Sequence, residues 1–77
     1  MKPLTYLVSV YSAERGEWML AGHFTDSEIA NIVFCRLTRM FPDDKFRFIS
    51  SDNLKAPIKQ ADKEYMRAIE KLTQNLA

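Results

Sequence analysis

Hydrophobic and polar residues alternate over residues 4–12 and again over residues 17–24. Alternation with a period of two is typical of strands whose two faces differ in polarity. The residues between the two stretches are polar and end in Gly16, which readily adopts turn conformations. The pattern therefore predicts a β-hairpin over residues 4–24.

The same alternation assigns the hairpin residues to faces. We expect Tyr6, Val8 and Val10 to share one face of the first strand, and Trp18, Leu20 and Phe24 to share one face of the second. The face that helices leave uncovered is then expected to carry Thr5, Leu7, Ser9, Tyr11, Met19 and His23. Gly22, inside the second strand, indicates a bulge or the close approach of a helix.

A helical spacing of apolar residues follows the hairpin. The apolar positions are Ile29, Ile32, Val33, Leu37 and Met40. We expect Thr25 to cap the helix and Glu28 to reach back to it, and Pro42 to stop the helix. The pattern predicts a helix near residues 26–40, with Ile29, Val33 and Leu37 buried.

The second half of the chain predicts one strand and one helix. Residues 45–50 alternate, with Phe46 and Phe48 on a face that we expect to join the core. A helix is predicted from about residue 58 to about residue 74, after Pro57. Its buried face is expected to contain Ile58, Ala61, Tyr65, Ala68, Ile69 and Leu72.

The predicted order is β-β-α-β-α, which indicates a single α+β domain over residues 1–77. We expect a two-layer architecture, with a small antiparallel or mixed three-stranded sheet and two helices packed on one face. A chain of 77 residues is close to the lower size limit for a self-sufficient core. Small size and an open sheet edge both favour a homodimer.

Composition and charge exclude several classes. Hydrophobic residues make up 47% of the chain, as in globular proteins, and the net charge of +1 is not the strongly basic balance of a dedicated nucleic-acid binder. The lone Cys35 leaves no internal disulfide and no cysteine pair for zinc. Neither a targeting segment nor a membrane-spanning apolar run is evident. We expect a cytoplasmic protein with no membrane partner.

Cations recur every four residues in the last third of the chain, at Lys55, Lys59, Lys63, Arg67 and Lys71. At this spacing each residue turns only about 40° around a helix from the previous one, so a slanted basic stripe is predicted. Asp62, Glu64 and Glu70 flank it. The stripe is either a solvated helix face or a docking surface for an acidic protein or for phosphates.

Candidate chemistry is sparse. His23 is the only histidine, and a Cys35–His23 pair is the one arrangement that would suit a small enzyme. Cys35, however, falls within a predicted helix and not at a helix N-terminus, where thiolates form. The sequence therefore predicts no catalytic residue, no metal site and no cofactor.

These observations favour a non-catalytic regulator, inhibitor or adaptor that binds another protein, and the basic stripe favours a partner with an acidic surface. The expected binding residues are the basic stripe, the hairpin residues Tyr11 and Met19, and Lys45 and Arg47 in the last strand. The alternative is a nucleic-acid-binding module that uses the stripe together with Lys45 and Arg47.

Overall fold

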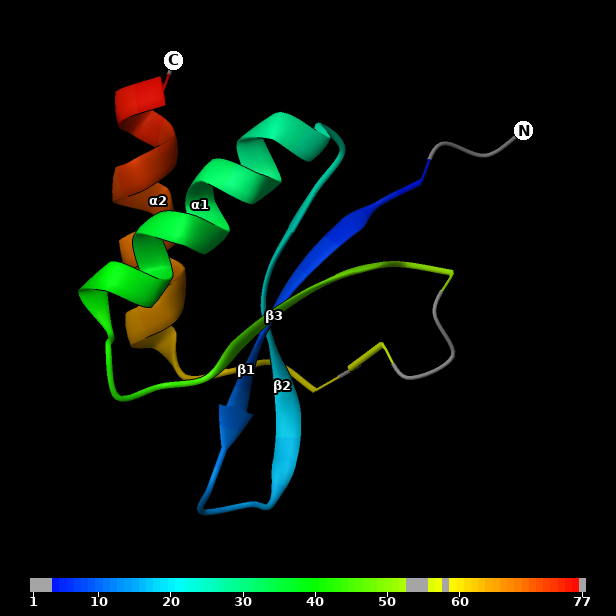
Figure 1. The fold of residues 1–77 in the computed structure, drawn as a ribbon, viewed down its shortest axis with the longest axis vertical. Helices are drawn as coiled ribbons and strands as arrows, with labels where there is room; N and C mark the ends of the chain where they lie inside the picture. The colour runs from blue at the N-terminus through cyan, green and yellow to red at the C-terminus, as the bar shows by residue number, and fades with distance from the viewer. Residues whose placement is uncertain (1–3, 53–55, 58, 77) are drawn as a thin grey trace.

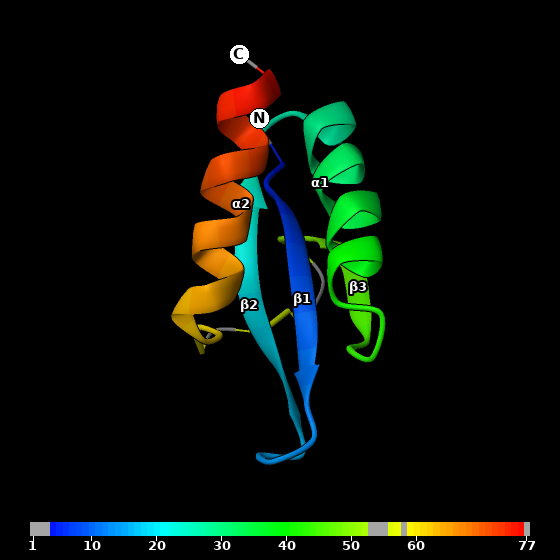
Figure 2. The same cartoon turned by 90° about the vertical axis from the view of Figure 1, so that its left-hand side faces the viewer.

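The computed structural model describes residues 4–52, 56–57 and 59–76. Its elements are β1 (Tyr6–Ser12), β2 (Glu17–Phe24), α1 (Ser27–Met40), β3 (Phe46–Ser50) and α2 (Lys63–Leu76). The three strands form an antiparallel sheet in the order β2-β1-β3, and both helices lie on one face of it, side by side and antiparallel (Figures 1 and 2). The predicted α+β class, element order and layering are confirmed.

The core lies between the helices and the inner face of the sheet, meaning the face that the helices cover. Val8 of β1 and Val33 and Leu37 of α1 are fully buried there. Phe46 and Phe48 of β3 are half-buried against this core, as predicted. On α2 the buried side chains are Ala68, Tyr65 and Leu72, with Ile69 half-buried beside them.

Two expectations about α1 are wrong. Asp26, and not Thr25, caps the helix, because its Oδ1 accepts hydrogen bonds from the backbone N–H groups of Glu28 (2.8 Å) and Ile29 (3.2 Å). Ile29 is exposed, as are Ile32 and Met40, because Ala30 occupies the adjoining buried position. The helix therefore faces the core with Ala30, Val33 and Leu37.

A β-bulge in the hairpin reverses part of the predicted face assignment. The register shifts between Val8 and Ser9, which pair with Gly22 and Leu20, so that Ala21 is the extra residue of β2. Met19 is therefore buried in the core, and not on the uncovered face as predicted. Trp18 and Leu20 instead share the outer face, since they pair with Tyr11 and Ser9.

Gly22 allows α2 to approach the bulge closely. A Cβ atom added at Gly22 would lie 2.8 Å from Cδ1 of Ile69 and 3.4 Å from the ring of Phe24. The expectation that Gly22 marks a bulge or a close helix approach is thus confirmed on both counts, and the approaching helix is α2.

The predicted start of the last helix is wrong, because Lys59–Ala61 is extended. The N–H of Leu20 donates to the carbonyl of Lys59 (2.7 Å), and the N–H of Ala61 donates to the carbonyl of Leu20 (2.8 Å). This pairing with the outer edge of β2 satisfies the backbone without a helix, and α2 begins only at Lys63. The predicted buried position Ile58 lies outside the described residues.

The connection from β3 to α2 runs from one edge of the sheet to the other. With the helices in front, its described residues pass behind the sheet (Figure 2). Leu7 and Ser9, which point to this outer face, are buried. The outer face is therefore partly covered at one end and open near the hairpin turn, where Tyr11 is exposed.

Candidate interaction surfaces

An aromatic and cationic cluster lies on the outer face, formed by Tyr11, Trp18 and Arg47 from three different strands. The ring centroids of Tyr11 and Trp18 are 5.5 Å apart in an edge-to-face arrangement. The guanidinium carbon of Arg47 lies 4.4 Å from the centroid of the Trp18 ring, within the range of a cation–π contact. We call these three residues the outer cluster.

The outer cluster is held by the register of the sheet. Tyr11 pairs with Trp18 across β1 and β2, while Ser9 pairs with Arg47 across β1 and β3. Stacking on Trp18 fixes the planar guanidinium of Arg47. The two terminal nitrogens of this group carry N–H donors that suit a carboxylate or another planar acceptor. Within the described part of the chain, Arg47 Nε and the hydroxyl of Ser9 are buried without a hydrogen-bond partner.

The exposed cations of α2 form a second surface. Lys63, Arg67 and Lys71 are all exposed and follow one another at four-residue spacing, and we call them the α2 ridge. Glu64 and Glu70, also exposed on α2, lie beside them in the sequence. The ridge therefore has mixed charge at its margins, as a solvated helix face does.

The predicted basic stripe is shorter than its sequence spacing suggests. Lys59 precedes the helix, and its Nζ lies 3.2 Å from Oε1 of Glu17 in an exposed ion pair. Lys55 lies outside the described residues. Lys45 is exposed immediately before β3, where its carbonyl accepts a hydrogen bond from the N–H of Tyr11 (2.9 Å). The structure thus separates the predicted binding residues into different surfaces.

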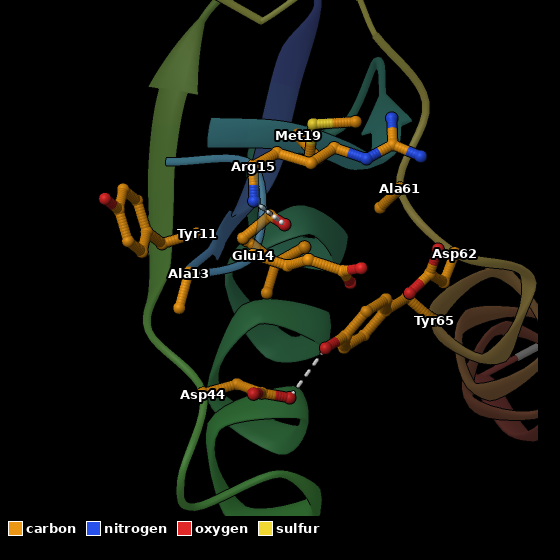
Figure 3. A pocket seen from close by; sticks show the side chains of 11 residues that line it. Tyr11, Ala13, Glu14, Arg15, Met19, Asp44, Ala61, Asp62 and Tyr65 are labelled. Atoms are coloured by element: carbon orange, nitrogen blue, oxygen red, sulfur yellow. Dashed lines mark hydrogen bonds between the residues drawn. The ribbon is translucent and has the colours of Figure 1, made fainter. Parts of the chain in front are cut away.

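A cavity of about 200 Å³ lies at the foot of the hairpin. It is bounded by the hairpin turn, by the turn that follows α1 and by the start of α2. Figure 3 shows Glu14, Asp44 and Asp62 around the ring of Tyr65, while Tyr11 turns to the other side. Among the described residues that line this cavity, acidic side chains therefore outnumber cations, and Arg15 is the only positive one.

Tyr65 joins this cavity to the core. Its hydroxyl donates a hydrogen bond to Oδ2 of Asp44 (2.7 Å), and its ring packs against Phe41 and Phe46 with centroids 5.0 Å and 5.9 Å away. Burial raises the pKa of the Tyr65 phenol well above its usual value, and the hydrogen bond to Asp44 and the negative charge of Asp44 add to this. The phenol therefore acts as a fixed hydrogen-bond donor and not as a base at neutral pH.

The remaining candidate chemistry has no shared site. His23 is exposed on β2 and Cys35 is exposed on α1, and neither lines the cavity at Tyr65. In the ranges that the structure describes, no three His, Cys, Asp or Glu side chains are grouped so that they could hold a metal ion. No helix in those ranges is long and apolar enough to cross a membrane.

Two features of these candidate surfaces are not predicted from the sequence. Trp18 was assigned to the inner face, because strict alternation ignores the bulge that turns it outward beside Arg47. The signal that could have found it is Gly22, which marks the irregularity in β2. The hydrogen bond between Tyr65 and Asp44 joins residues 21 positions apart and leaves no local pattern in the sequence.

Comparison with known proteins gives no relatives: no protein-family model, curated protein or solved structure matches this chain.

Proposed function

We propose that this chain is a non-catalytic, cytoplasmic protein-interaction domain that acts as a homodimer and binds an acidic partner protein through its outer cluster. The observation that carries the proposal is the stacking of Arg47 on Trp18 beside the exposed Tyr11. Trp, Tyr and Arg are the residue types that most often contribute the binding energy of protein interfaces.

The rigidity of the outer cluster supports this proposal. Its side chains project from paired strands, and each aromatic ring has only two rotatable side-chain bonds, so little conformational entropy is lost when a partner orders them. Edge-to-face packing and the cation–π contact restrict them further. Such a preorganised patch contrasts with the long, exposed side chains of the α2 ridge.

The charge of the outer cluster supports an acidic partner. Arg47 supplies the positive group, and Lys45 lies two residues earlier, immediately before β3. The nearest acid on β2, Glu17, is already paired with Lys59. A carboxylate of the partner can therefore pair with the stacked guanidinium, since Arg binds carboxylates in a planar, two-point geometry.

Site-specific photo-crosslinking in the source cell tests the proposal. A photo-reactive phenylalanine analogue replaces Tyr11 in one variant and Arg67 of the α2 ridge in the other, and mass spectrometry identifies the adducts. We expect the variant at position 11 to form an adduct with a protein that has an acidic surface. In extracts the yield of this adduct should fall as the salt concentration rises. The variant at position 67 should not form this adduct.

Three results would contradict the proposal. Adducts that form only at position 67 would assign binding to the α2 ridge. Adducts that nuclease digestion removes would identify nucleic acid as the ligand. Adducts at position 11 that contain only a second copy of this chain would make the outer cluster a self-association surface.

A further inference from the structure

The two edges of the sheet differ in how they are covered. At the β2 edge, Leu20 forms two backbone hydrogen bonds with the extended segment Lys59–Ala61. β3 forms the other edge, and no described strand lies beyond it. Natural proteins usually protect an exposed edge, because its unpaired backbone groups can pair with another strand.

The hydrogen-bond pattern shows which groups of β3 face outward. Tyr11 donates to the carbonyl of Lys45 (2.9 Å), and Ser51 donates to the carbonyl of Thr5 (2.7 Å), at the two ends of the β1–β3 ladder. Hydrogen-bonded pairs alternate along an antiparallel ladder, so Arg47 and Ile49 also bond to β1. The N–H and C=O groups of Phe46, Phe48 and Ser50 therefore point away from the sheet.

The side chains of β3 do not protect this edge. The strand has the sequence Phe-Arg-Phe-Ile-Ser, with no proline and no acidic residue. Its one charge, Arg47, points to the outer face and stacks on Trp18. An inward-pointing charge, a proline or a bulge is the usual protection of an edge strand, and the β1–β3 register contains no shift.

We infer that β3 pairs antiparallel with β3 of a second copy of this chain, about a two-fold axis at Phe48. This register aligns the whole of β3 with its copy: Phe46 faces Ser50 of the copy, Phe48 faces Phe48, and all the outward amide and carbonyl groups meet. The inference deepens the homodimer part of the proposed function. It concerns the β3 edge and not the outer cluster, so an experiment can contradict the dimer without contradicting partner binding at the outer cluster.

Charge and packing favour this two-fold register. An axis at Arg47 would bring two guanidinium groups face to face, whereas an axis at Phe48 places Arg47 opposite Ile49 of the copy. Lys45 before the strand and Asp52 after it are both exposed, and antiparallel pairing brings these opposite charges to the same end of the interface. On the inner face, Phe48 already contacts the rings of Tyr6 and Phe34, and pairing adds a contact with Phe48 of the copy.

A second copy is the occupant that these features fit best. The edge is complementary to itself in hydrogen bonding and in charge, and the net charge of +1 per chain gives little mutual repulsion. Pairing also compensates for the small core of a 77-residue chain. The resulting sheet is continuous across both copies and carries both outer clusters on the same face, because the axis is perpendicular to the sheet.

Sedimentation of purified chains tests the dimer, with S50P as the blocking variant. Proline removes the outward N–H of Ser50, which β1 does not use, while S50A removes only the hydroxyl and keeps the amide. We expect wild type and S50A to sediment at twice the 9.0 kDa chain mass, and S50P to show a dissociation constant raised roughly 10-fold or more. A wild type that stays monomeric to near-millimolar concentration overturns the inference.

Disulfide crosslinking tests the register, and it does so even if S50P fails to fold. In a C35S background, R47C/I49C places thiols opposite each other across the axis at Phe48, about 4.5–5.5 Å apart at Cα, which suits a disulfide. We expect covalent dimers from R47C/I49C on mild oxidation. R47C or I49C alone should not crosslink, because each crosslinks only if the axis passes through its own position. A folded R47C/I49C dimer that does not crosslink, or efficient crosslinking of either single variant, overturns the register.

Discussion

The two faces of the sheet are built from the same strands but have different compositions. On the inner face, Val8 and Val10 are almost completely buried under helix residues such as Leu37. On the outer face, Tyr11 is exposed and Arg47 stacks on Trp18. Alternate residues of β1 therefore differ in environment, since one set closes the core and the other lies on the outer face, where Tyr11 belongs to the surface that we propose as an interface.

If the proposed function is correct, this difference separates effects on stability from effects on partner binding along a single strand. Substitutions on the inner face should act through the free energy of unfolding, because they leave cavities or cause overpacking. Substitutions at the open end of the outer face should act mainly on affinity, since their contacts are partly solvated. Small domains have a low free energy of unfolding, so a substitution on the inner face should remove a large and easily measured fraction of it.

Truncating a core side chain of α1 should have the largest effect on stability. Leu37 is fully buried, so L37A should reduce the free energy of unfolding by about 2–5 kcal/mol, measured by urea denaturation. I32A is the matched control on the same helix, because Ile32 is 37% exposed, and it should cost less than about 1 kcal/mol. Equal losses for the two variants would show that the inner face of α1 is misassigned.

Filling the space at the bulge should have a somewhat smaller effect. A Cβ at position 22 would overlap Cδ1 of Ile69, so G22A should cost about 1–3 kcal/mol. I69V removes that methyl group, and the double variant G22A/I69V should regain part of the loss. If I69V restores no stability in the G22A background, the close approach of α2 to the bulge is not the cause of the loss in G22A.

The hydrogen bond from Tyr65 to Asp44 should produce a pH dependence. The phenol has a raised pKa in the folded chain, so its contribution to stability is complete below the unfolded value of 10.0 and is lost as the pH rises above it. Wild type should therefore lose stability more steeply from about pH 9 to about pH 11 than Y65F does. Y65F should cost about 1 kcal/mol at neutral pH.

D44N separates the causes of this pH dependence, because it removes the negative charge beside the phenol and keeps a hydrogen-bond acceptor. The total stability that D44N loses above pH 10 should be smaller than that of wild type, because the pKa of its folded phenol is raised less. Identical slopes for wild type, D44N and Y65F would contradict the raised pKa of Tyr65.

The sequence predicts the elements of this fold better than it predicts their faces. Alternation and helical spacing locate all five elements, since these periods follow from local backbone geometry. The inserted Ala21 inverts the alternation in β2, so Trp18 and Met19 exchange faces. The extended segment at Lys59 depends on long-range pairing with Leu20, which no local pattern encodes.

The candidate site was accordingly predicted only in part. Tyr11 and Arg47 were expected to bind a partner, and they lie together on the outer face. Their neighbour Trp18 was placed on the wrong face, and Met19 was included although it is in the core. Four-residue spacing correctly predicted that Lys63, Arg67 and Lys71 are exposed together on a helix, and their binding role stays a prediction. The spacing could not reveal that Lys59 precedes the helix and pairs with Glu17.

The most direct test of the account is the affinity of the partner captured at position 11 for two variants, measured by titration calorimetry. Y11S/W18L removes the outer cluster's aromatic rings, and K63E/R67E/K71E reverses the α2 ridge, far from the β3 edge in the sequence. With both variants folded and dimeric, we expect affinity to fall roughly 10- to 100-fold for Y11S/W18L and to change by less than about threefold for the ridge variant. An unchanged affinity for Y11S/W18L together with a large loss for the ridge variant would contradict the account.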